Sequence, residues 1–170
     1  MDAENREQHY SLTRSNRQMQ LKNHDICLYA KVSCFDGLKA GGYVIYQAEI
    51  KIAAESYSIY RRVEPSHIEI IAVSTGLMAC VSKVATRFAT NIIVYCDNKA
   101  AVGVLRGRKP RESKKEARNV WKIQSEWTRR DRLAHVETGK VFGKWERGHR
   151  GNSGNQETDS LAKIGAQMAN

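Results

Sequence analysis

The order of hydrophobic patterns along the chain is the feature that most limits its fold. Three stretches rich in Ile, Val and Tyr come first and predict strands. A long segment of helical period follows, and then a short continuous apolar run, "NIIVYC", typical of a strand buried on both faces. We expect strands at 26–35, 42–50, about 52–60, 91–96 and 140–145, and helices at 65–88, 98–105, within 106–132 and at 153–170. This βββαβα, helix, βα order predicts a mixed α/β layer fold with a five-stranded sheet, not a parallel βαβ repeat.

The 170 residues are enough for one domain with a substantial core. Residues 1–24 are polar and charged with little periodicity, which predicts a flexible tail, with a short docking helix as the alternative. The folded domain should therefore cover residues 25–170. Within it, Gly37, Gly41 and Gly42 are expected to mark the connection between the first two strands.

The formal net charge of +10 and the pI of about 9.6 favour a polyanionic partner, with nucleic acid ahead of a membrane surface. A basic protein that merely stays soluble is the alternative. No apolar run approaches the length of a membrane span, and the first residues lack the apolar core of a signal peptide. The four cysteines form no C-x-x-C pair, so neither a zinc site nor a disulfide framework is expected. These features predict an intracellular protein, nuclear or cytoplasmic, with reduced cysteines.

Residues 106–132 are the most basic stretch of the chain, with eleven Lys or Arg against four acids and a net charge of +7. Val120, Ile123 and Trp127 keep an apolar helical stripe within it. The stretch is either a solvated helix face or a surface that binds phosphates. The candidate phosphate contacts are Arg106, Arg108, Lys109, Lys114, Lys115 and Arg118.

Three acids stand where strands end and helices begin. Asp97 follows the buried strand, Glu69 is expected in the first turn of the long helix, and Asp159 lies early in the closing helix. Three converging carboxylates would form an oxygen-ligand site for Mg²⁺ or Mn²⁺, suited to two-metal phosphodiester chemistry. Each acid also has a purely structural interpretation. Glu69 could close a capping box with Ser66, Asp97 could cap the next helix, and Asp159 could favour its helix dipole. His149, in a Gly-rich loop, could be an ordinary surface residue.

Four segments together resemble a known family. "YCDNKAAVGVL", "SHIEIIAVSTGL" and "SCFDGLKAGG" look like the third-acid segment, the central helix and the first hairpin of type 1 ribonuclease H domains. "WERGHRGNSGNQETDSLAKIGA" resembles their closing signature, a GH-x-G-x-x-GN loop leading to D-x-LAK-x-GA. The likeness covers about residues 26–168 and is strongest to the domains of non-LTR, LINE-like retroelements. It implies a ribonuclease H-like fold, divalent metal ions and hydrolysis of RNA–DNA hybrids.

Position by position, the resemblance places Glu69, Asp97 and Asp159 on three of the family's four metal-binding carboxylates. His149 falls on the loop histidine that is thought to help product release or proton transfer. Asn155 falls on the asparagine before the last helix, and we count it among the candidate nucleic-acid contacts.

The first carboxylate of the pattern is missing. Ser33 matches the serine of the family's T-D-G-S, so the acid should stand at position 31, where this chain has Lys31. Asp36 is too close to the following glycine pair to replace it. A lysine removes one negative ligand and adds a positive charge. Two unit charges 4 Å apart interact with about 4 kcal/mol at an effective dielectric near 20, so the free energy of metal binding should become less favourable by several kcal/mol. We therefore expect Lys31 to be an internal cation that occupies a metal position, ringed by the three acids, and pairs with Glu69, Asp97 or Asp159.

These observations predict a ribonuclease H-like domain that binds an RNA–DNA hybrid or RNA and has lost or nearly lost hydrolysis, with no cofactor. One alternative is an active hybrid-specific ribonuclease with Mg²⁺ or Mn²⁺ on Glu69, Asp97 and Asp159, assisted by His149. A second alternative is a scaffold that binds a protein partner. An RNA–DNA hybrid cleavage assay on the chain and on Lys31→Asp separates the first two.

Overall fold

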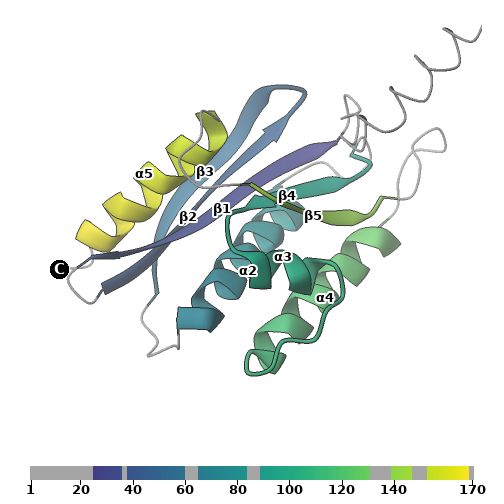
Figure 1. The fold of residues 1–170 in the computed structure, drawn as a ribbon. Coiled ribbons are helices and arrows are strands. Elements are labelled where there is room, and N and C mark those ends of the chain that lie inside the picture. Colours follow the sequence, from purple (N-terminus) through teal and green to yellow (C-terminus); the bar gives the residue numbers. More distant parts are fainter. Residues whose placement is uncertain are drawn as a thin grey trace, which may run out of the picture.

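The computed structural model describes residues 25–35, 38–59, 65–83, 89–130, 139–146 and 153–168. These ranges hold five strands and four helices (Figure 1). The strands are β1 (Ile26–Phe35), β2 (Leu38–Gln47), β3 (Ile50–Ile59), β4 (Ile92–Cys96) and β5 (Val141–Trp145). The helices are α2 (Pro65–Lys83), α3 (Lys99–Leu105), α4 (Lys114–Arg129) and α5 (Ser153–Met168).

All five strands form one mixed sheet in the order β3-β2-β1-β4-β5. β1 to β3 are antiparallel neighbours, whereas β4 runs parallel to β1 and β5 runs parallel to β4. This confirms the predicted α/β fold with a mixed five-stranded sheet. The parallel pairs place the carboxyl ends of β1, β4 and β5 toward the same end of the sheet, which is where ligands gather in such folds.

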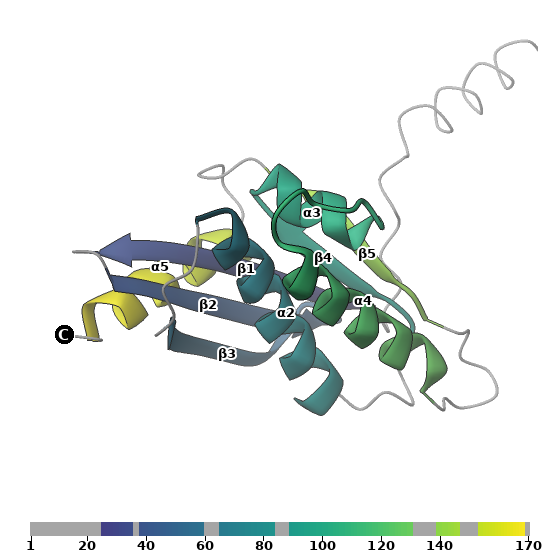
Figure 2. The ribbon, with the colours of Figure 1, turned by 90° about the horizontal axis from the view of Figure 1, so that it is seen from below.

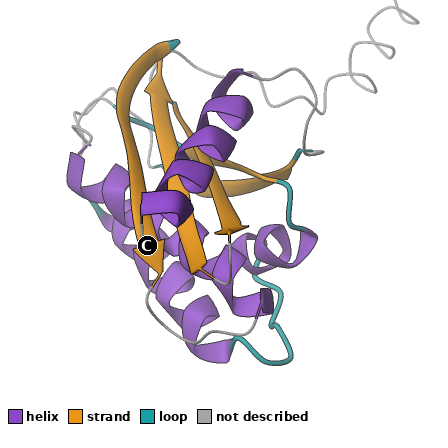
Figure 3. Cartoon of the chain, turned by 90° about the vertical axis from the view of Figure 1, so that its left-hand side faces the viewer, coloured by secondary structure: helices purple, strands orange, loops and turns teal. Residues whose placement is uncertain are grey.

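Helices cover the two faces of the sheet unequally. α5 packs on β1, β2 and β3 from one side, and α2, α3 and α4 lie on the other (Figures 1 and 2). Figure 3, viewed from the side of α5, shows this helix lying across the strands. Because side chains alternate along a strand, Leu28 of β1 packs against Gly76 of α2, while Lys31 points to the α5 side and meets Asp159.

The core lies between the sheet and the helices α2, α3 and α4. Leu28 and Val94 of the central strands are fully buried in it. The apolar stripe predicted for the basic helix is confirmed, since Val120, Ile123 and Trp127 of α4 are all buried in the same core. Because this apolar side of α4 packs on the core, its charged side faces solvent. No helix within the described ranges is both long and apolar enough to cross a membrane.

The first hairpins differ from the prediction. β2 ends at Gln47, because Ala48 and Glu49 adopt positive φ angles of 49° and 65° and form the turn to β3. Neither residue type predicts this conformation, so the sequence pattern extended the strand to residue 50. Gly41 and Gly42 lie inside β2 and not in a connection. At Gly42 a Cβ would come within 2.9 Å of the Ala162 backbone nitrogen, so glycine lets α5 approach the sheet closely.

Two helix predictions agree with the structure as far as it is described. The helix expected at 65–88 is α2 up to Lys83, and residues 84–88 lie outside the described part of the chain. The helix expected within 106–132 is α4, and residues 106–113 form the connection that leads into it. Several sequence predictions also fall outside the described residues, namely the tail 1–24, Asp36 and His149. The side chains of Ser66 and Asn155 are likewise not described.

Candidate active site

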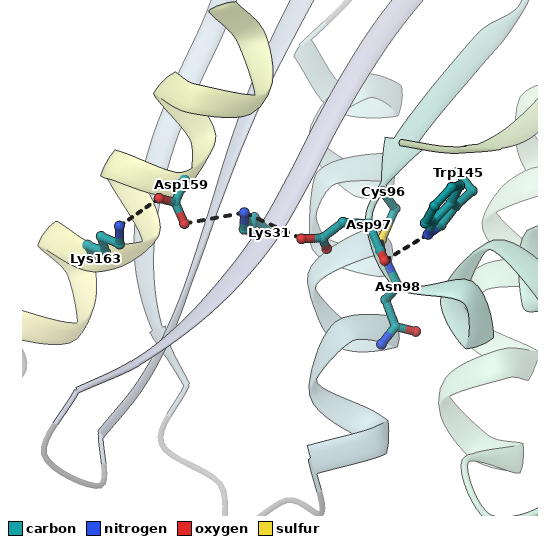
Figure 4. Close-up of polar contacts among 7 residues, drawn as sticks. All are labelled: Lys31, Cys96, Asp97, Asn98, Trp145, Asp159 and Lys163. Carbon is teal, nitrogen blue, oxygen red and sulfur yellow. Dashed lines mark hydrogen bonds and ion pairs between the residues drawn. The ribbon is translucent and has the colours of Figure 1, made fainter. Parts of the chain in front are cut away.

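Lys31 lies at the centre of the site. Its side chain leaves β1 on the α5 side, and only 8% of the residue is exposed. The ammonium nitrogen lies 3.4 Å from Asp97 Oδ2 and 3.4 Å from Asp159 Oδ1 (Figure 4). One lysine therefore joins the carboxyl end of β4 to helix α5. The internal cation expected at position 31 therefore has two carboxylate partners.

Asp97 directly follows β4 and does not cap the next helix. The N-cap of α3 is Asn98, whose side-chain oxygen accepts a hydrogen bond from the Ala101 backbone N–H at 2.9 Å. The capping interpretation of Asp97 was therefore wrong by one residue. The physical consequence is that the Asp97 carboxylate is available to the ammonium of Lys31. The Asp97 main-chain oxygen accepts a hydrogen bond from Trp145 Nε1 at 3.0 Å, which ties this turn to the end of β5.

Asp159 lies in the second turn of α5, since the helix begins at Ser153. Its second carboxylate oxygen pairs with Lys163 Nζ at 2.7 Å, so it lies between two cations. Burial raises the pKa of Asp159, but the hydrogen bond from Lys163 and the charge of Lys31 outweigh burial and lower the pKa below its ordinary value. The ion pairs therefore keep Asp159 ionised at neutral pH, and they explain its position better than the helix dipole does.

Glu69 reaches the site from the opposite face of the sheet. α2 begins at Pro65, so Ser66 lies inside the helix and Glu69 is in the second turn, which corrects both the first-turn placement and the capping box. Its Oε2 atom is buried and finds no hydrogen-bond partner among the described residues. Burial, and next the charge of Asp97, raise the pKa of Glu69 to about 7, while Lys31 opposes the shift. Near neutral pH this carboxyl group is about half protonated.

The three predicted acids thus gather around Lys31, but unequally. Glu69 and Asp97, together with the buried thiol of Cys96, offer ligand atoms that all lie within 4.8 Å of one another. Asp159 belongs to the ion-paired side of the site. Along this side, the charges alternate from Asp97 to Lys31, Asp159 and Lys163 (Figure 4). Whether any of these groups binds a metal remains a prediction.

Two neighbours of the site escaped the sequence reasoning. Lys163 stands four residues after Asp159 on α5, a spacing that brings opposite charges together and could have been recognised. Trp145 could not, because only the pairing of β5 with β4 brings its indole to Asp97.

The candidate phosphate contacts share one property, which is exposure. The side chains of these six residues all reach solvent, and no carboxylate of the described part of the chain pairs with them; they are Arg106, Arg108, Lys109, Lys114, Lys115 and Arg118. Arg106 also donates from Nε to the Gly143 main-chain oxygen at 3.3 Å, which anchors it to β5. The positive charges of the segment are thus available to an external anion.

Fold and site together define a ribonuclease H-like protein: a mixed sheet with helices on both faces and acidic residues at the carboxyl end of β4 and on the flanking helices. The comparison with family models agrees. The model described as RNase H matches residues 23–167, and the chain therefore belongs to the RNase H family.

Solved structures support the same fold. RNase H1 of the halophilic archaeon Halobacterium salinarum is 14% identical, with a TM-score of 0.64 over 85% of this chain and 98% of its own. The N-terminal RNase H domain of a Mycobacterium tuberculosis protein is 18% identical, with a TM-score of 0.61 over 86% and 99%. LC11-RNase H1, in complex with an RNA/DNA hybrid, is 16% identical, with a TM-score of 0.63 over 85% and 98%. No curated protein matches the chain significantly.

Proposed function

We propose that this chain is a hybrid-binding domain of the RNase H family, derived from a non-LTR retroelement, in which hydrolysis is lost or severely weakened. The observation that carries the proposal is the position of Lys31 Nζ, 3.4 Å from a carboxylate oxygen of both Asp97 and Asp159. An ammonium there supplies the positive charge that the acids require. The retroelement origin is supported by the closing signature at residues 145–166.

The site residues do not fit a pair of divalent ions. Three carboxylates share the site with two lysines, Lys31 and Lys163, so only one negative charge is left uncompensated, too little for two divalent ions. A divalent ion 4 Å from the Lys31 ammonium would meet a repulsion of about 8 kcal/mol at an effective dielectric of 20, twice the value for two unit charges. The Lys31 ammonium therefore occupies the site in place of the metal ions.

Binding of nucleic acid rests on different residues. The six candidate contacts between Arg106 and Arg118 named above form a phosphate-binding surface that positions a duplex without reading its sequence. The net charge of +10 favours the same partner. The RNA/DNA hybrid in the LC11-RNase H1 complex supports this class of ligand for the fold. Affinity should fall steeply with salt, because each neutralised phosphate releases counterions.

Cleavage of a labelled RNA–DNA hybrid in Mg²⁺ or Mn²⁺ tests the loss of hydrolysis. We expect no cleavage by the unmutated chain and a gain of cleavage in Lys31→Asp, which restores the missing acid. Lys31→Asn is the matched control, because it removes the ammonium without restoring a charge. Robust cleavage by the unmutated chain would overturn the proposal in favour of an active ribonuclease, for which the grouping of Glu69, Cys96 and Asp97 is the best support.

Binding is measured separately, by fluorescence anisotropy of the same hybrid at increasing salt. Six phosphate contacts predict a slope of log K against log salt of roughly −5. An affinity that does not change with salt concentration, or no binding at low salt, would contradict the hybrid-binding half of the proposal. The cleavage result would be unaffected.

A further inference from the structure

Trp145 is a large apolar side chain that stays exposed beside the site. It is the last residue of β5, and 40% of it is accessible. Its indole Nε1 donates to the Asp97 main-chain oxygen, and the Lys99 ammonium lies 5.1 Å from the centre of the ring. Figure 4 shows the indole directed toward Asp97. The two contacts fix the ring next to the acids while leaving much of it in water.

The other two tryptophans of the chain serve the core. Trp127 is fully buried, and the indole of Trp121 donates to the Val104 main-chain oxygen at 2.8 Å. Burial of an aromatic ring stabilises a fold, and an exposed ring contributes little of that stability. Packing therefore explains Trp121 and Trp127 but does not explain why Trp145 is a tryptophan.

Trp145 also lies at a suitable distance from the basic surface. Helix α3 begins at Lys99, beside the indole, and leads to Arg106, the first residue of the phosphate-binding segment. Its seven residues span about 10 Å, or roughly three steps of a nucleic-acid strand at 3.4 Å each. A strand held at Arg106 can therefore reach the indole within a few nucleotides.

We propose that Trp145 and Lys99 bind an unpaired nucleotide that flanks the hybrid, with the indole stacked on the base and the ammonium on a phosphate. Inside a duplex both faces of each base are covered by neighbouring bases, and only the end pair keeps one free face, so an unpaired flanking base is the better partner for the ring. This inference rests on the proposed function and adds the form of the ligand: a hybrid with a single-stranded extension, preferred to a blunt one.

The test compares a short blunt RNA–DNA hybrid with the same hybrid carrying a single-stranded tail, by anisotropy at one fixed salt concentration. Stacking of one base predicts a tailed hybrid bound about five-fold to a hundred-fold more tightly. Trp145→Ala should bring the ratio of the two affinities close to one. Trp145→Phe should keep most of the ratio, because it keeps an aromatic ring and loses only the donor to Asp97. Ile50→Ala, at an exposed apolar residue of β3, is the matched control and should keep the full ratio.

Tryptophan emission provides a second readout that does not depend on how the alanine variant folds. The tailed hybrid should quench the emission of the unmutated chain more than the blunt one does, and Trp145→Phe should abolish this extra quenching. A ratio near one in the unmutated chain, or extra quenching that persists in Trp145→Phe, would overturn the stacking proposal while blunt-hybrid binding still supports the proposed function. If neither hybrid binds, the proposed function fails and this inference fails with it.

Discussion

Replacing Lys31 with methionine removes the ammonium from the site while keeping a similar length and volume. Asp97 and Asp159 then lose their shared cation, and their side chains are only 25% and 19% exposed. Water cannot fully replace the lost partner at such sites. Each carboxylate therefore stays partly buried while its negative charge is less well compensated.

The size of the effect follows from the two distances. At 3.4 Å and an effective dielectric of 20, each pair contributes about 5 kcal/mol of gross attraction. Desolvation of the three charges offsets much of this, and removal of one partner of a buried pair typically costs about 3–5 kcal/mol. Because Lys163 still pairs with Asp159, we expect a cost at the low end of this range, about 3 kcal/mol. For a chain of this size, that corresponds to a drop in Tm of about 6–12 °C.

Lys51→Met is the matched control. Lys51 also pairs with a carboxylate, that of Glu157, but its side chain is 50% exposed, so solvent screens the pair and the same substitution should cost much less stability. Urea unfolding of the unmutated chain and the two variants, followed by circular dichroism, measures the difference. A loss at Lys31→Met no larger than at Lys51→Met would refute the view that Lys31 is an essential internal cation.

Four further outcomes follow from the structure. Mg²⁺ should leave the Tm of the unmutated chain unchanged but stabilise Lys31→Asp by about 2.7 kcal/mol at a hundred times the Kd, as thermal melting will show. Because the pKa of Glu69 is raised to about 7, wild-type stability should fall as pH rises from about 4.5 to 7. Glu69→Gln should therefore stabilise the fold at pH 8, by at most about 3 kcal/mol, and change little at pH 4, as urea unfolding at both pH values will test. Gly165→Ala should destabilise by about 1–3 kcal/mol, since its Cβ would meet the Ser56 hydroxyl; an unchanged unfolding midpoint would contradict this packing. Asn98→Ala should cost about 1 kcal/mol in the same assay through the lost cap of α3, whereas Asn98→Asp should not.

The sequence predicted the elements whose period or composition is decisive. The continuous apolar run before Asp97 is the buried strand β4, and the stripe from Val120 to Trp127 is the buried side of α4. Both were predictable because burial imposes a local pattern on the side chains. The turn at Ala48 and Glu49 was not, because these residue types do not favour positive φ and the conformation follows from the pairing of β2 with β3. The first-turn placement of Glu69 failed because a sequence pattern predicts the type of an element better than its first residue, and α2 begins at Pro65.

The sequence by itself determined the residue types of the site: three acids in a family pattern, a lysine where the first acid of that pattern should stand, and a strongly basic segment after α3. The family pattern also predicted that this lysine pairs with the acids, and only the tertiary structure decided which of them lie within ion-pair distance. Two carboxylates from distant parts of the chain meet one ammonium because β4 pairs with β1 and α5 crosses the same face of the sheet. Charge pairing depends on distances of a few ångströms, and such distances between remote residues are set by packing and not by any local pattern.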